Sequence, residues 1–101
     1  MAHVIARLSE LQDETPARVS TPRGVCAVVR VGREVHVLDD TCPHRGGSLG
    51  QGSFEAGVIV CPLHRWAFRV DTGRGVGIAA ATFVERFPVE VVGDEVISEL
   101  A

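Results

Sequence analysis

The amino-acid sequence lacks the features that mark membrane, secreted and nucleic-acid-binding proteins. Its apolar runs, such as Val58–Val60, fall far short of the ~20 residues that span a bilayer. Its start has no apolar core behind a basic end, as a secretory signal would, and no two arginines are adjacent. The net charge of −3 leaves no basic excess for neutralising phosphates. We therefore expect a soluble, cytoplasmic protein that binds neither nucleic acid nor a membrane.

Cysteine and helical periodicity are scarce as well. Three cysteines do not make a disulfide framework, which the reducing cytosol also disfavours. The single helix candidate, Ser9–Glu14, covers at most two turns before Pro16. With 101 residues the chain has room for one domain, residues 1–101, and a bound metal would help to stabilise so small a core.

Alternating, β-branched segments fill most of the remaining chain and predict an all-β fold. Two of them meet at Gly32-Arg33 and two more at Gly93-Asp94, and glycine at the first turn position is typical of a type II′ hairpin. Phe87, Val89 and Val91 alternate, so they should share one face of the second hairpin. The other segments expected to be strands are Val4–Leu8, Val25–Val31, Glu34–Leu38 and Val58–Val60.

Glycines are concentrated in two segments between the hairpins. Residues 41–52 contain four of them and residues 73–77 contain three. Such density indicates loops whose backbone must come close to another group. The sequence therefore predicts one β domain with a loop-built site inserted between its strands.

Each of two loops offers one cysteine and one histidine: Cys42 with His44, and Cys61 with His64. Thiolate and imidazole suit zinc, copper or an iron–sulfur cluster, and they exclude calcium and magnesium. A structural zinc ion is the simplest alternative, because two cysteines and two histidines are a common zinc set. Finger-type zinc sites usually pair like with like along the chain, however, whereas the order here alternates. A [2Fe-2S] cluster in which two histidines replace two cysteines on one iron needs this ligand set.

The sequence around these four residues resembles the Rieske family, in particular its soluble ferredoxin-like members. The matching pattern is C-P-H, then sixteen residues, then C-P-L-H-R-W-A-F-x-x-x-T-G. The resemblance implies an antiparallel β sandwich or barrel with a cluster-binding subdomain built from loops at about 41–52 and 61–77. It also implies one [2Fe-2S] cluster per chain.

By this resemblance Cys42 and Cys61 hold the inner iron, while His44 and His64 hold the outer iron near the surface. Glycines in the first loop would let backbone N–H groups approach the sulfides, and such hydrogen bonds tune a cluster's potential. The residues expected around the cluster are Gly46, Gly47, Pro62, Trp66 and Phe68.

The chain also departs from the family pattern. Arg65 stands where many members carry glycine, and the loop that would cover the cluster reads G-V-G-I-A-A-A-T without proline. The extra cysteines of high-potential members are replaced near Gly47 and at Leu63, so their disulfide is absent. Those members also carry a serine and a tyrosine that donate O–H bonds to the cluster region, where this chain has Trp66 and Phe68.

A few other reactive or charged residues admit simpler interpretations. Cys26 lies beside Val28 in a predicted strand, which favours a buried apolar thiol and not a ligand. His36 shares a strand face with Glu34, so we expect a solvated or weakly paired histidine. Arg45 and Arg65 each follow a histidine of the site, and they are either partner-docking residues or solvated charges.

A cluster of this kind exchanges single electrons and has no substrate pocket of its own. The two histidines left over, His3 and His36, are poorly suited to a catalytic iron site. We therefore expect a non-catalytic, monomeric ferredoxin that passes electrons from a reductase to an oxygenase. The alternative from the same resemblance is the small subunit of an NAD(P)H-dependent nitrite reductase. A zinc-stabilised interaction module is the third hypothesis.

Overall fold

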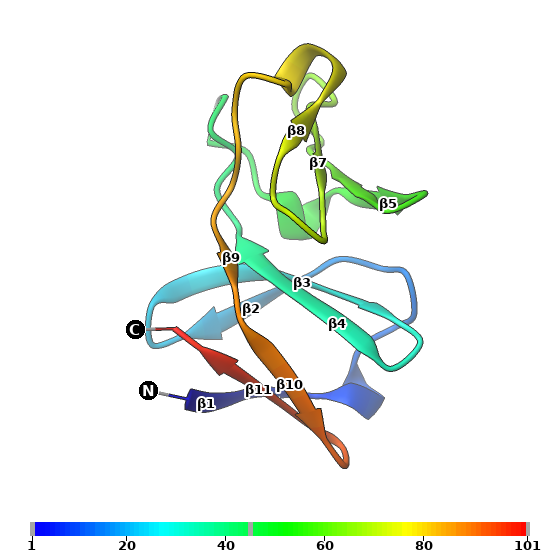
Figure 1. Cartoon of the computed structure of the whole chain (residues 1–101), viewed down its shortest axis with the longest axis vertical. Coiled ribbons are helices and arrows are strands. Elements are labelled where there is room, and N and C mark those ends of the chain that lie inside the picture. Colours follow the sequence, from blue (N-terminus) through cyan, green and yellow to red (C-terminus); the bar gives the residue numbers. More distant parts are fainter. Residues whose placement is uncertain (1, 45, 101) are drawn as a thin grey trace.

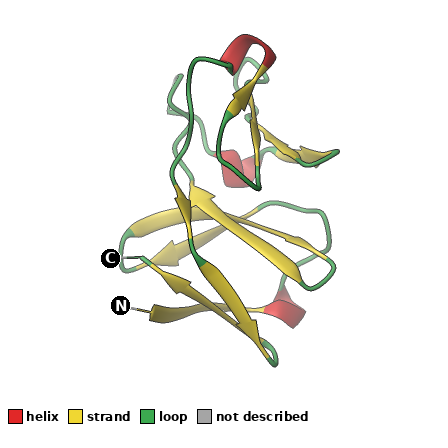
Figure 2. Ribbon diagram, in the orientation of Figure 1, coloured by secondary structure: helices red, strands yellow, loops and turns green. Residues whose placement is uncertain are grey.

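A computed structural model describes residues 2–44 and 46–100, and in them the chain forms β-strands, short 3-10 turns and no α-helix (Figure 1 and Figure 2). The strands are β1 (Ala2–Arg7), β2 (Ala17–Thr21), β3 (Gly24–Val31), β4 (Glu34–Asp39), β5 (Ser53–Glu55), β6 (Val58–Val60), β7 (Ala67–Arg69), β8 (Gly75–Val76), β9 (Arg86–Phe87), β10 (Val89–Val92) and β11 (Glu95–Glu99). The 3-10 turns are η1 (Leu8–Glu10), η2 (Leu49–Gln51) and η3 (Gly77–Ala79). The predicted all-β fold is confirmed, whereas Arg45 lies outside the described residues.

Three antiparallel sheets follow one another along the long axis of the molecule (Figure 1). The lower sheet has the order β1-β11-β10, the middle sheet β2-β3-β4-β9, and the upper sheet β5-β6-β7-β8. The chain passes from the middle sheet into the upper sheet after β4 and returns through β9, so the upper sheet is an insertion. Within the described residues no helix is long and apolar enough to cross a membrane.

The middle sheet has a buried core on each of its faces. Along β3, Ala27 and Val29 belong to the core beneath the upper sheet, while Cys26 and Val28 belong to the core against the lower sheet. This alternation is the period-2 pattern of a strand, with both faces covered. We call these the upper core (Ala27, Val29, Leu38, Cys42, Leu49, Ile59, Cys61, Phe68, Val70, Ala79 and Val84) and the lower core (Leu8, Leu11, Cys26, Val28, Val35, Val37, Phe87, Val96 and Leu100).

Both predicted hairpins are confirmed. Gly32 and Gly93 have φ of +64° and +60°, while Arg33 and Asp94, which follow them, have no positive φ. A positive φ at the first turn position alone defines a type II′ turn, which glycine occupies without strain. Val31 pairs with Glu34 across the first turn and Val92 with Glu95 across the second.

The prediction of a short helix over Ser9–Glu14 was wrong, because only a single 3-10 turn, η1, forms there. The structure also contains strands that the sequence pattern did not reveal, namely β2, β5, β7 and β8. Three of these have only two or three residues, which is too short for alternation to be recognised. Strand β2 is an edge strand with polar residues at three of its five positions.

Candidate metal centre

The two segments that carry the cysteine–histidine pairs are closed by the same hydrogen bond. The Cys42 N–H donates to the Gly47 carbonyl at 2.8 Å, and the Cys61 N–H donates to the Trp66 carbonyl at 2.7 Å. In both cases the acceptor lies five residues after the cysteine. We call these turns the first loop (residues 42–47) and the second loop (residues 61–66). Each loop bends back over its cysteine and carries one histidine on the turn.

In space, the four side chains are sorted by chemical type. Cys42 and Cys61 are 1% and 0% exposed, and both belong to the upper core. His44 is half-buried and His64 exposed, and their ring centroids are 5.2 Å apart. Among the described residues, no three Cys, His, Asp or Glu side chains gather where one ion could be held. The residues that alternate in the sequence are therefore grouped by type in the structure: the two thiols are buried, and the two imidazoles are in contact and more exposed.

The surroundings of the two thiols disfavour their ionised, thiolate form. Burial is the main cause that raises the pKa of the Cys61 thiol, and the neighbouring Cys42 raises it further. A backbone hydrogen bond from Leu63 acts in the opposite direction. Iron would supply the positive charge that two adjacent thiolates require, so the donor set fits a metal group.

The backbone of the first loop approaches the thiols closely. A Cβ on Gly47 would lie 2.8 Å from the Cys61 sulfur and 3.2 Å from Leu63, so only glycine fits at this position. Gly46, its neighbour, has a φ of +72°, a conformation that glycine adopts without cost. The expectation that glycines mark close backbone approach is met here. The first loop backbone therefore passes close to the Cys61 sulfur, where it could donate hydrogen bonds to a metal group held by the cysteines.

Aromatic residues contact this site from one side. The Trp66 ring stacks on His44 with centroids 4.1 Å apart and planes only 3° from parallel. Phe68, in β7, is fully buried in the upper core, which also contains Cys42 and Cys61. Trp66 packs against the same core, whereas Pro62 is exposed on the second loop. The direct contact between Trp66 and His44 was not foreseen, because sequence separation gives no signal for it.

The second loop holds two consecutive residues in the left-handed backbone conformation. His64 has a φ of +62° and Arg65 a φ of +57°. For residues with a Cβ this conformation costs roughly 1–2 kcal/mol each. The backbone at Arg65 therefore has a geometry that glycine would adopt more easily, and arginine adopts it with strain. The Arg65 side chain is exposed and lies 3.6 Å from Glu55.

The loop that follows β8 is ordered without proline. The Gly75 N–H donates to the Thr82 carbonyl at 2.9 Å, and the Thr82 hydroxyl donates to the Ala79 carbonyl at 2.8 Å. Ala79, in η3, is fully buried in the upper core. These contacts hold the loop at the same end of the molecule as the upper sheet (Figure 1).

Cys26 lies apart from the site, as expected. It is buried in the lower core, on the opposite face of the middle sheet from Cys42 and Cys61. Burial raises the pKa of its thiol, and the Thr21 hydroxyl lies 3.8 Å from the sulfur. The prediction of a buried apolar thiol is confirmed.

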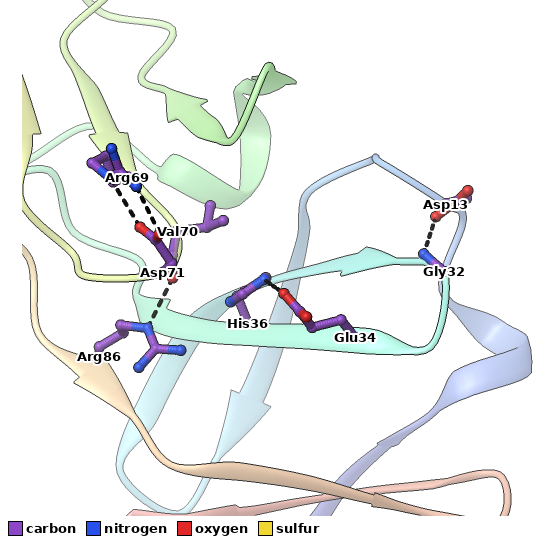
Figure 3. A network of polar contacts seen from close by, with 8 residues as sticks. All are labelled: Asp13, Gly32, Glu34, His36, Arg69, Val70, Asp71 and Arg86. Carbon is purple, nitrogen blue, oxygen red and sulfur yellow. Dashed lines mark hydrogen bonds and ion pairs between the residues drawn. The ribbon is translucent and has the colours of Figure 1, made fainter.

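His36 was expected to be solvated or weakly paired, and the structure confirms the pairing but not the solvation. The side chain is only 5% exposed, although its Nε2 does pair with Glu34 Oε1 at 2.8 Å (Figure 3). The upper sheet covers this face of β4, and a cavity of about 440 Å³ between them is lined by His36 together with Val70 and Asp71. Alternation in β4 predicted the correct face, but the sequence gave no indication that a second sheet lies over it.

Sequence reasoning also missed Asp40, a buried carboxylate just before the first loop. Its Oδ1 accepts hydrogen bonds from the Ser48 hydroxyl at 2.9 Å and from the Gly50 N–H at 2.8 Å. These donors lie eight and ten residues further along the chain, so no local turn pattern in the sequence indicates the contact.

The fold and the site together define a class of protein: a metalloprotein whose β scaffold presents paired cysteines and histidines at one end. Residues 1–88 match the model of the Rieske [2Fe-2S] domain. The chain belongs to that family.

Its relatives include ferredoxin components of oxygenases. It is 36% identical over 93 residues to ferredoxin CarAc of Metapseudomonas resinovorans, covering 91% of this chain and 87% of the relative. It is 30% identical over 95 residues to the anthranilate 1,2-dioxygenase ferredoxin subunit of Burkholderia cepacia, covering 93% and 87%. A solved complex of reduced oxygenase and oxidized ferredoxin in carbazole 1,9a-dioxygenase contains a chain with a TM-score of 0.88 and 33% identity, covering 98% and 93%.

The fold is also shared with a different class of oxidoreductase subunit. A chain described as an NADH-dependent nitrite reductase small subunit from Mycobacterium tuberculosis has a TM-score of 0.85, covering 97% of this chain and 93% of that one. Its identity of 18% is evidence for the fold alone.

The strained second loop allows a direct test. Replacing Arg65 with Gly should raise the free energy of unfolding by about 1 kcal/mol, because glycine relieves the left-handed strain and its entropic cost is smaller. Arg65→Ala is the matched control: it removes the same exposed side chain and its pairing with Glu55 but keeps the strain, so stability should stay within about 0.5 kcal/mol. Urea unfolding of both variants in the same loading state measures the difference, and equal stabilities would contradict the interpretation.

Proposed function

We propose that Cys42, His44, Cys61 and His64 bind one Rieske-type [2Fe-2S] cluster. The sorting of the side chains supports this assignment, because one iron of such a cluster takes two thiolates and the other takes two imidazoles. Gly46 and Gly47 would bring the first loop close to the sulfides, and Trp66 and Phe68 would pack beside and beneath the cluster. Pro62 would shape the second loop. When bound, the cluster would supply reversible one-electron chemistry.

The function we propose is that of a ferredoxin, passing single electrons from a reductase to an oxygenase. One observation carries it most directly: His64 is exposed and His44 half-buried, whereas both cysteines are fully buried. Electrons would therefore leave through His44 and His64, at the end that a partner can approach. The relatives named as ferredoxin components of dioxygenases support the same assignment.

The remaining expectations form part of this proposal. The chain would act as one domain over residues 1–101, in the cytoplasm and as a monomer when free. The nitrite reductase small subunit is retained as the second candidate because a solved chain of that description shares the fold. Stable co-purification with a large reductase subunit would favour that role, and a free monomer that reduces an oxygenase would favour the carrier. A zinc-stabilised module would be colourless.

Cluster content is the first prediction. The purified protein should be red-brown with two iron and two sulfide per chain. Cys61→Ala or His64→Ala should lose the cluster and much of the fold, because metal binding is coupled to folding. Cys26→Ala is the control, since its thiol faces the lower core, and it should retain full iron and sulfide. One equivalent of zinc and no sulfide in protein made under iron-replete, anaerobic conditions would refute the proposal.

Charge is distributed unevenly along the chain. Residues 41–77 contain four arginines and two acidic residues, a balance of 4 − 2 = +2, so the rest of the chain carries −3 − 2 = −5. Within this segment Arg65 pairs with Glu55, and Arg69 pairs with Asp71. A positive end on a negative body would orient the protein toward an acidic partner surface.

The second prediction follows from that asymmetry. Electron transfer to the partner should slow as ionic strength rises, because steering between opposite charges is screened. Arg65→Glu should reduce the association rate more than it changes the cluster's potential. Arg33→Glu makes the same charge change in the β3–β4 turn, where the guanidinium donates to the Gly93 carbonyl of the lower sheet, and should have the smaller effect. Electron-transfer rates that do not change with ionic strength would contradict this prediction and would indicate that the arginines are solvated surface charges.

The reduction potential should be low for this family. The serine and tyrosine hydroxyls that high-potential members direct at the cluster are replaced by Trp66 and Phe68, of which phenylalanine has no donor and indole has one N–H. A charge-assisted hydrogen bond contributes roughly 1.5–3 kcal/mol. Two lost donors could therefore lower the potential by on the order of 100–200 mV. We expect a value near roughly −150 mV, at the low end of the Rieske range.

The third prediction is that Phe68→Tyr, alone or with Trp66→Ser, raises the potential. A hydroxyl at the buried Phe68 position would need a partner, and the reduced cluster is the acceptor that it would stabilise. Phe54→Tyr is the control. Phe54, in β5, is partly buried against the same core, so this substitution adds the same hydroxyl at the margin of the core. Protein-film voltammetry measures the shift. A wild-type potential well above zero would contradict the low-potential assignment and leave the cluster proposal intact.

A further inference from the structure

Asp40 is a buried carboxylate that supports the first loop. It is 5% exposed and lies two residues before Cys42. Its Oδ1 accepts the Ser48 hydroxyl and the Gly50 N–H, and its backbone carbonyl accepts the Leu49 N–H at 2.8 Å. Three consecutive residues that directly follow the first loop are thus bonded to one residue. A carboxylate in such a position is costly to bury unless hydrogen bonds and a counter-charge stabilise it.

The cationic partner of Asp40 is Arg18, on edge strand β2. The Arg18 Nε lies 3.5 Å from Asp40 Oδ2, and the arginine side chain is 48% exposed. Because the contact is long and the guanidinium is half in solvent, it compensates the carboxylate only in part. The donors on the other oxygen, Ser48 and Gly50, are neutral. A net negative charge therefore remains buried beside the first loop.

This charge lies next to the first cysteine of the site. Asp40 precedes Cys42 by two residues, and both side chains are buried. Cys42 and Cys61 belong to the upper core, where the low dielectric weakens screening between charges. A charge on Asp40 would therefore act on a group bound to Cys42 as well as on the segment to which Asp40 is bonded.

Resting on the proposed function, we propose that the Asp40–Arg18 pair tunes the reduction potential of the cluster, with Asp40 lowering it and Arg18 raising it. Reduction transfers one electron from the reductase to the cluster and neither forms nor breaks a bond to the protein. The added negative charge is disfavoured by a nearby carboxylate and favoured by a nearby guanidinium. Asp40 is therefore a positioning residue for the first loop and also an electrostatic one for the cluster.

Asp40→Asn tests the carboxylate with little change of shape. The amide keeps an oxygen for Ser48 and Gly50 and removes the charge. We expect the reduction equilibrium to shift about tenfold toward the reduced state, which is about 59 mV for one electron. Asp94→Asn is a closely matched control. Asp94 accepts the Ser9 N–H and hydroxyl at 2.8 Å, in the lower-sheet turn, and is 41% exposed beside Arg7. Its replacement should leave the potential unchanged.

Arg18→Gln tests the pair from the other side, and at an exposed position where folding and cluster loading should survive. Its potential should fall, opposite in sign to Asp40→Asn, while Arg7→Gln should show no shift. Voltammetry of proteins with equal iron and sulfide content measures the reduction potentials of the Asp40→Asn and Arg18→Gln variants and of their controls. Opposite shifts support the proposal. An Arg18→Gln potential equal to that of Arg7→Gln would overturn it, whether or not Asp40→Asn retains its cluster. Wild-type protein without iron and sulfide would instead overturn the proposed function.

Discussion

Two equivalent backbone hydrogen bonds, one in each loop, shape the candidate metal centre. Each cysteine N–H donates to the carbonyl five residues ahead, which folds each loop over its own cysteine. Because both loops close in the same way, the two thiols meet inside the upper core and the two imidazoles meet above it. The alternating order of the sequence is therefore what two equivalent loops produce. Like side chains are paired across the loops rather than along the chain, as a two-iron cluster with unlike irons requires.

The middle sheet makes this arrangement possible in so small a protein. Its strands bury one face against the lower sheet and the other beneath the upper sheet, so β3 and β4 serve two cores. The upper sheet has strands of two or three residues and depends on that shared support. Phe68 anchors it, since this ring lies in β7 and packs in the core that holds both cysteines.

How far the sequence predicts this molecule depends on the range of the interaction. Local patterns sufficed for the hairpin turns at Gly32 and Gly93 and for the cysteine–histidine spacing. The burial of His36 and the stacking of Trp66 on His44 depend on how the inserted sheet lies over β4, about which alternation within one strand is silent. Short strands such as β8 form because their neighbours pair with them and carry no signal of their own.

Several unfavourable features of the structure lie at the candidate metal centre, although Glu14 and Ala56 elsewhere also have positive φ. His64 and Arg65 hold left-handed backbone conformations, and Asp40 keeps a carboxylate buried with only a half-exposed guanidinium opposite. Local rules are commonly violated at functional sites, where the surrounding structure must stabilise the exception. For an electron carrier such a site has a use, because loops held in advance need not rearrange when the charge changes. If these loops hold the proposed cluster, the strained second loop and the bonded first loop would both help to keep its surroundings fixed while an electron is transferred.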